Sequence, residues 1–143
     1  MSAIRRLDHV AVVVRDTDEA LRTFGDRFGL PVAHSESQPA GVRLTYLDCG
    51  NAYLQLVEPT DPDHELARWL DEHGEGLHHI CFGVDDALAA AAELAPDGAP
   101  TPVAGSGRGR VSAFVPGKPP HGVRLECTEL EPADGAAMPE SVH

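Results

Sequence analysis

The sequence predicts an α+β fold in which two βαβββ modules form one shared, cup-shaped mixed β-sheet. The first observation is an internal repeat, because two apolar, β-prone stretches each carry a histidine at the equivalent position, His9 and His79. The repeat continues near the end of each half, where Gln55 and Glu126 occupy matching positions within apolar stretches. Self-similarity of this kind determines an architecture, and packing alone does not explain polar residues that recur inside strands.

The first module is expected over about residues 6–60. A strand at 7–14 is followed by Asp16 as a cap candidate and by a helix from about 18 to 28. Helical spacing places its apolar residues in the core, and these are Ala20, Leu21, Phe24 and Phe28. The rest of the module is predicted as strands at 31–36, 42–47 and 52–57, with a loop or edge segment at 37–41 and a turn at 48–51.

A linker helix within about residues 61–75 leads to the second module, expected over about 76–130. The second module repeats the same order, with a strand at 77–84, a helix at 86–95, a short extended piece at 101–104, a flexible loop at 105–109, and strands at 110–115 and 123–130. The tail, 131–143, has no apolar period and is expected to be frayed. We expect residues 1–143 to form a single domain.

Composition excludes several functional classes. Hydrophobic residues make up 42% of the chain and are spread too evenly for a membrane span. The net charge of −12 argues against nucleic-acid binding. The three cysteines, Cys49, Cys81 and Cys127, include no close pair, which fits a reducing cytoplasm, and no secretion signal is visible at the N-terminus.

One segment of this acidic chain is basic. No acid occurs between Asp97 and Glu126, whereas Arg108, Arg110 and Lys118 fall there. These residues are candidates for binding an anionic ligand such as the phosphates of a nucleotide-like carrier. Scattered solvated charges are the alternative interpretation.

The four repeat-matched polar residues form the candidate metal site. Two imidazoles, one amide oxygen and one carboxylate suit a divalent first-row ion, so His9, Gln55, His79 and Glu126 are predicted to bind Co²⁺, Ni²⁺, Mn²⁺, Zn²⁺ or Fe²⁺. With Glu126 as the only anionic ligand, the site keeps a positive charge that stabilises an enolate. Any single histidine in a strand is more often a core residue, and His78 is expected to be a surface or supporting group.

These residues resemble the vicinal oxygen chelate superfamily from about residue 6 to 130, and within it the methylmalonyl-CoA epimerase family. The specific parts are the stretches 53–59 and 74–80 and the His121-Gly122-Val123 triplet before Glu126. The resemblance implies paired modules, a divalent metal at the four positions named above, a homodimer and a small-molecule substrate, possibly an acyl-CoA. It implies a metal-stabilised enolate and a protein base that removes the α-proton.

The base position departs from the family pattern. The family has a Glu just before a triplet that aligns here with Ala40-Gly41-Val42, which puts Pro39 at the base position. Proline accepts no proton, so the sequence predicts weak or no epimerase activity unless another group acts. Glu36 is the nearest carboxylate in the chain, and water on the metal is a second candidate. The alternative functions are another metal-dependent enzyme of the superfamily (a lyase, isomerase or dioxygenase) and a drug-binding resistance protein.

Overall fold

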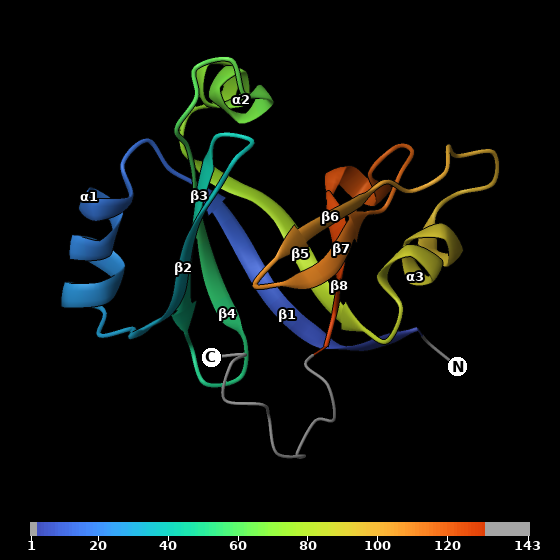
Figure 1. Cartoon of the computed structure of the whole chain (residues 1–143), viewed down its shortest axis with the longest axis horizontal. Coiled ribbons are helices and arrows are strands. Elements are labelled where there is room, and N and C mark those ends of the chain that lie inside the picture. Colours follow the sequence, from blue (N-terminus) through green and yellow to red (C-terminus); the bar gives the residue numbers. More distant parts are fainter. Residues whose placement is uncertain (1–2, 131–143) are drawn as a thin grey trace. The chain divides into compact units, whose positions relative to one another are not determined.

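The computed structural model describes residues 3–130, so the predicted tail at 131–143 lies outside the described residues. Eight strands form one mixed sheet in the order β2-β3-β4-β1-β5-β8-β7-β6 (Figure 1). The chain divides into two compact units, residues 7–81 and residues 82–130 with 3–6. The described helices are all too short to span a membrane.

The unit of residues 7–81 contains the first βαβββ module. Its elements are β1 (Ile4–Val13), α1 (Thr17–Leu21), the π-helical segment η1 (Arg22–Arg27), β2 (Val32–Gln38), β3 (Val42–Asp48), β4 (Tyr53–Pro59), α2 (Glu65–His73) and β5 (Gly76–Val84), with β1 and β5 continuing into the other unit. β1 pairs with β4 in parallel, whereas β2, β3 and β4 pair antiparallel. The predicted order of elements is therefore confirmed here.

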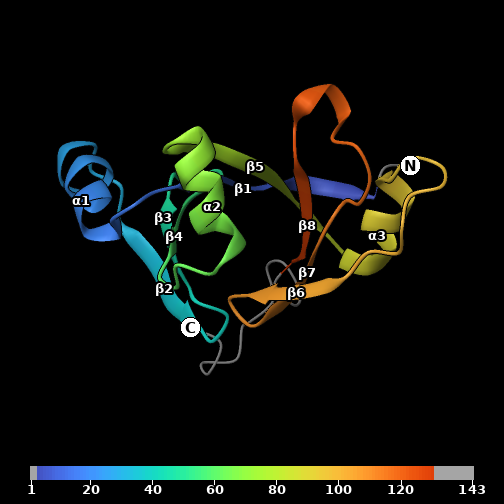
Figure 2. The same cartoon turned by 90° about the horizontal axis from the view of Figure 1, so that it is seen from above.

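Helices cover both faces of this part of the sheet. On one face, α1 and η1 pack through Leu21 and Phe24 against Leu47 and Leu56, which are fully buried. On the other face, α2 packs through Leu70 onto a separate cluster (Figure 2). The other members of that cluster are Ala11, Val13, Val42, Leu44, Tyr46 and Val57, with Tyr53, Leu66 and Trp69 packed against it.

The sequence placed Phe28 in the core, and this prediction is wrong, because Phe28 is 59% exposed. The α-helix changes to a π-helix from Arg22 to Arg27. A π-helix is hydrogen-bonded between residues i and i+5, so two residues that are four positions apart no longer lie on the same face. Phe28 consequently leaves the core, although its ring still contacts Phe24, with centroids 5.4 Å apart.

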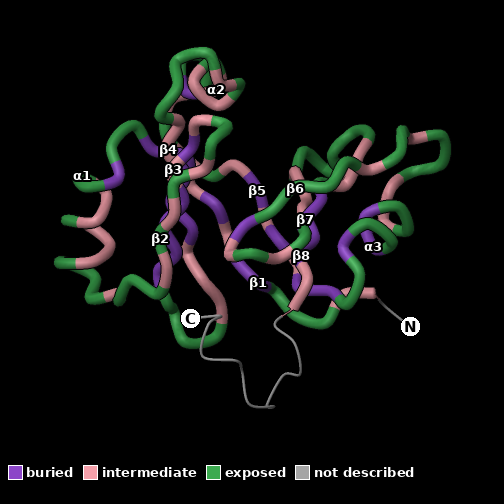
Figure 3. Tube along the Cα trace, in the orientation of Figure 1, coloured by how far each residue is buried: buried purple, intermediate pink, exposed green. Residues whose placement is uncertain are grey.

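The second unit repeats the module. After β5 come α3 (Ala87–Leu94), β6 (Ala104–Gly107), β7 (Arg110–Phe114), the 3-10 turn η2 (Pro120–Gly122) and β8 (Leu125–Glu129). The alanines of α3 pack against Ala113 and Cys127 in a separate core cluster. In both units burial is concentrated in the strands (Figure 3). The α+β class and the two βαβββ modules are confirmed, whereas the single domain stays a prediction.

Two predicted loops are shorter than expected. β2 extends to Gln38, and the Gly-rich stretch at 105–109 is mostly strand, because β6 pairs with β7 as far as Gly107 opposite Arg110. Only Arg108 and Gly109 form the turn, and both have positive φ, 58° and 71°. Two-residue hairpin turns of type I′ require positive φ at both positions. Pairing between neighbouring strands thus overrides the local preference of glycine for loops.

Each module uses a glutamate to hold the start of its helix. Glu58 Oε1 accepts hydrogen bonds from the backbone nitrogen and the hydroxyl of Thr17, at 2.9 and 2.6 Å. Glu129 Oε2 accepts one from the backbone nitrogen of Ala87 at 3.1 Å. These bonds satisfy donors that a helix leaves unpaired in its first turn, and they fix each helix to the last strand of its module.

We expect Glu58→Ala to lower the free energy of unfolding by about 2 kcal/mol, because it removes two charge-assisted bonds to a buried threonine. Glu129→Ala removes one hydrogen bond, from the backbone nitrogen of Ala87, and should cost about half as much. Glu72→Ala, on the exposed side of α2, is the control and should stay within about 0.5 kcal/mol. Urea denaturation measures all three, and equal losses at Glu58 and Glu72 would contradict the capping role.

Candidate metal centre

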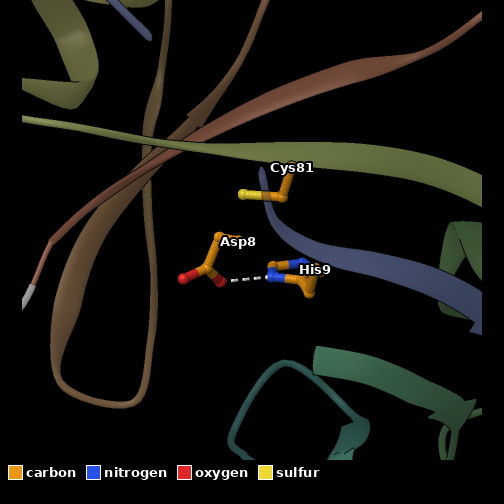
Figure 4. A group of neighbouring side chains, drawn as sticks. All are labelled: Asp8, His9 and Cys81. Carbon is orange, nitrogen blue, oxygen red and sulfur yellow. Dashed lines mark hydrogen bonds and ion pairs between the residues drawn. The ribbon is translucent and has the colours of Figure 1, made fainter. Parts of the chain in front are cut away.

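His9 lies in the middle of β1 and is 2% exposed. The carboxylate of the preceding residue, Asp8, is also buried, and its Oδ2 lies 2.7 Å from His9 Nδ1 (Figure 4). A hydrogen bond at one imidazole nitrogen sets the ring orientation and the tautomer. With Nδ1 as the donor to Asp8, the lone pair of the His9 ring lies on Nε2.

His79 lies in β5, is 8% exposed and meets His9 edge to face, with ring centroids 5.5 Å apart. Both rings belong to the unit of residues 7–81, so the fold of this unit alone brings the two repeat-matched histidines together. His78 Nδ1 lies 2.8 Å from His79 Nδ1. This contact fits the supporting role that the sequence left open for His78, and that role stays a prediction.

Gln55 reaches the same sheet face through strand register. It pairs with Ala11 of β1 and with Tyr46 of β3, and it is 4% exposed. Its Nε2 donates a hydrogen bond to the Tyr46 hydroxyl at 2.9 Å. Gln55 Oε1 is buried and has no hydrogen-bond partner within residues 3–130. Burial of an unsatisfied amide oxygen costs free energy, which a ligand at that oxygen would offset.

The side chains of this unit fit a divalent ion. Two imidazoles and an amide oxygen are donors that first-row divalent ions accept, and the amide oxygen is without another partner among the described residues. Cys81 adds a sulfur nearby: the ligand atoms of Asp8, His9 and Cys81 lie within 4.8 Å of one another (Figure 4). A buried thiol is small, and it leaves the neighbouring imidazole room.

Glu126, the fourth predicted ligand, belongs to the other unit. It lies half-buried in β8, opposite Phe114 of β7. Its carboxylate, together with burial, raises the pKa of the neighbouring Cys127 thiol to about 11, with burial the larger cause. The ligand and catalytic roles of Glu126 stay predictions.

Glu36 lies in β2 on the same sheet face as Gln55. The register pairs His34 with Tyr46 and Tyr46 with Gln55, and Glu36 follows His34 by two residues, so their side chains share a face. The Glu36 carboxylate is half-buried, with Oε1 2.9 Å from His34 Nε2 and Oε2 accepting from Gln38 Nε2 at 3.1 Å. Pro39 is exposed in the turn that follows.

The basic residues lie on two segments of the second unit. Arg108 and Arg110 occupy the β6–β7 hairpin and are half-buried, whereas Lys118 is exposed in the loop before η2. Arg108 has a φ of 58°, which is uncommon for a residue other than glycine. The two-residue hairpin turn accounts for this conformation, because a type I′ turn needs positive φ at both of its positions.

Sequence reasoning missed three residues that lie around the candidate site. Asp8 carried a usable signal, since it takes the repeat position of His78 and is a carboxylate inside an apolar strand. Tyr46 and His34 carried none, because only the pairing of β3 with β2 and β4 shows that they flank Gln55 and Glu36. The Tyr46 ring lies 5.6 Å from His9 and 5.9 Å from His34 between centroids.

Comparisons with known proteins agree with this arrangement. The sequence model of the Glyoxalase/Bleomycin resistance protein/Dioxygenase superfamily matches residues 8–114. The ethylmalonyl-CoA/methylmalonyl-CoA epimerase of Cereibacter sphaeroides is 34% identical over 118 residues, which cover 81% of this chain and 85% of that protein. The mitochondrial methylmalonyl-CoA epimerase of Homo sapiens is 33% identical over 91 residues, and the match spans about half (52%) of its length.

A solved structure of methylmalonyl-CoA epimerase with methylmalonyl-CoA and NH4+ matches with a TM-score of 0.77 and 33% identity, covering 93% of this chain and 99% of that one. The chain therefore belongs to the glyoxalase/bleomycin resistance protein/dioxygenase superfamily. Within it, the chain is an epimerase-like enzyme.

Burial predicts the reactivity of the thiols. Cys49 is exposed, whereas Cys81 and Cys127 are buried and the pKa of Cys127 is about 11, far above pH 8. Because the thiolate is the nucleophile, one thiol per chain should react quickly with Ellman's reagent at pH 8 and the other two only after denaturation. Cys49→Ser should abolish the fast phase, and a fast phase that persists would contradict the burial of the other two.

Proposed function

We propose that this protein is a metal-dependent epimerase that inverts the carbon between the thioester and the carboxylate of an acyl-CoA such as methylmalonyl-CoA. The observation that supports it best is the gathering of His9, His79 and Gln55 within residues 7–81, with Gln55 Oε1 unsatisfied among the described residues. The relatives are named as epimerases of such acyl-CoA substrates, and one solved structure of a relative contains methylmalonyl-CoA.

In this proposal His9, Gln55, His79 and Glu126 hold a divalent ion. When bound, the ion supplies positive charge that stabilises an anion developing on the substrate oxygens. Gln55 and the two neutral imidazoles donate without cancelling that charge, and Glu126 cancels one unit of it. The buried positions of His9, His79 and Gln55 keep bulk water from these donors, which strengthens electrostatic interactions at the site.

Glu36 takes the α-proton in this proposal. A Glu36 carboxylate oxygen accepts the proton, and the C–H electron pair moves into the thioester carbonyl to give the enolate. A solvent water then protonates the opposite face of the α-carbon, which inverts it, and the proton on Glu36 neutralises the hydroxide that this leaves. The support is the register of β2, which puts Glu36 on the sheet face of Gln55. His34 and Gln38 hold its two oxygens there, whereas Pro39 has no group that accepts a proton.

The test is loss of chirality and uptake of solvent deuterium at the α-carbon of (2R)-methylmalonyl-CoA. We expect the wild-type protein to exchange this proton and Glu36→Gln to do so about 10²- to 10⁴-fold more slowly, the usual contribution of a general base. Glu72→Gln, an exposed glutamate of α2, is the matched control. An unchanged rate in Glu36→Gln would remove Glu36 from the mechanism, and no exchange by wild type would overturn the epimerase proposal.

A second variant separates a relocated base from a lost one. Pro39→Glu places a carboxylate at the position where the resembling family has its base, and it should raise the rate. If Pro39→Glu alone exchanges the proton while wild type does not, the wild-type protein lacks a base and Glu36 does not replace it. If wild type is active and Glu36→Gln with Pro39→Glu recovers activity, either carboxylate serves.

The basic residues Arg108, Arg110 and Lys118 are proposed to bind the phosphates of the CoA carrier. Changing all three to glutamate should weaken binding of a CoA thioester and reduce the salt dependence of its affinity, because screened charge–charge attraction is lost. A short pantetheine thioester, which lacks the nucleotide phosphates, should bind both forms alike. If wild type binds the two thioesters equally well, these residues do not bind the phosphates of the CoA carrier.

A further inference from the structure

Each predicted metal ligand within residues 7–81 has a hydrogen-bond contact with a neighbouring side chain at an atom other than its predicted ligand atom. The pairs are Asp8 with His9 at 2.7 Å, His78 with His79 at 2.8 Å, and Tyr46 with Gln55 at 2.9 Å. Two of the three supporting residues immediately precede their ligand in the chain, at repeat-matched positions. The pattern therefore recurs with the module and is not a feature of one strand.

The bond between Asp8 and His9 is enclosed by protein. The side chain of Asp8 is fully buried and that of His9 is 2% exposed, so water does not compete for the pair. The carboxylate can only accept, which makes Nδ1 the donor and leaves the lone pair on Nε2. A carboxylate partner also raises the basicity of an imidazole ligand and thereby its affinity for a metal ion.

The bond between His78 and His79 implies a pair of tautomers. If His79 binds a metal through Nε2, its Nδ1 carries the proton and donates to His78 Nδ1 at 2.8 Å. His78 must then carry its own proton on Nε2. Trp69 of α2 packs edge to face on the His78 ring, with centroids 5.1 Å apart, so the helix holds the supporting histidine in place.

The bond between Tyr46 and Gln55 decides which end of the amide is presented. The hydroxyl accepts from Nε2, and Oε1 is therefore turned to the other side. Tyr46 is itself 2% exposed and lies edge to face against the His9 ring. Without this bond the amide could rotate and offer its NH₂ group, which is no metal ligand.

We propose that Asp8, His78 and Tyr46 are positioning residues of the metal centre, each fixing which atom of its neighbour, His9, His79 or Gln55, is turned to the ion. The inference rests on the proposed metal site and assigns functions to three residues that bind neither metal nor substrate. Loss of such partners lowers metal affinity by about 10- to 100-fold in metalloenzymes.

The experiment measures metal affinity, not turnover. The full-length chain is stripped with a chelator and titrated with Co²⁺, and binding is followed by calorimetry and by the visible absorption of the ion. We expect Asp8→Asn to weaken Co²⁺ binding by about 10- to 100-fold and His78→Phe and Tyr46→Phe to weaken it by about tenfold. Asp26→Asn is the charge-matched control, because Asp26 is exposed in η1.

Stability of the metal-free variants separates positioning from folding. Circular dichroism and thermal unfolding without metal show whether each variant is folded, and affinities are compared only among folded variants. His78→Phe keeps an aromatic ring against Trp69, and Tyr46→Phe removes a single oxygen, so both are conservative. If Asp8→Asn does not fold, these two variants decide.

The outcomes separate this inference from the proposed function. If the wild-type chain does not bind Co²⁺, the metal site itself is wrong. If wild type binds Co²⁺ and the folded variants bind it as tightly, with the same absorption spectrum, the positioning roles are wrong and the metal site stands. The inference is supported if the variants bind Co²⁺ more weakly and with an altered spectrum, while Asp26→Asn binds it as wild type does.

Discussion

Parallel pairing of β1 with β4 is the constraint on which the rest of the candidate site depends. The pairing sets Ala11 beside Gln55, and two residues earlier it sets His9 beside Tyr53. Because side chains alternate along a strand, a slip of one residue would turn Gln55 to the opposite face, against α1. The large apolar clusters on both faces make such a slip costly, so apolar packing determines the register of the site.

The internal repeat predicts this site well and also shows the limit of repeat reasoning. His9 and His79 are repeat-matched and do lie together. Glu58 and Glu129 are matched in the same way, yet they hold the first turns of α1 and α3. A recurring polar residue therefore marks a recurring polar environment, which is the candidate metal centre in one case and a helix start in the other. Position decides between them: the histidines are mid-strand and the glutamates are at strand ends.

Most of the fold could be predicted from the sequence because its signals are local. Alternating apolar residues, cap residues and turn residues locate every strand and helix to within a few positions. The π-helical segment that exposes Phe28 and the β6–β7 hairpin could not be predicted. Both follow from backbone hydrogen bonds, and the secondary-structure preferences of single residues do not reveal these. The roles of Tyr46 and Glu36 on the sheet face likewise depend on pairing between strands distant in sequence, which one sequence does not reveal.

The polar face of the first module lowers the stability of the fold that carries it. Asp8, His9 and Gln55 are buried among apolar residues, and each unsatisfied polar atom there costs about 1–3 kcal/mol. Hydrogen bonds from neighbouring side chains offset part of that cost, but Gln55 Oε1 has no such partner among residues 3–130. A ligand at this oxygen would therefore stabilise the folded chain as well as complete the site. If Gln55 binds a metal ion as proposed, stability and function are coupled there, because the buried oxygen whose burial costs free energy is also the metal ligand.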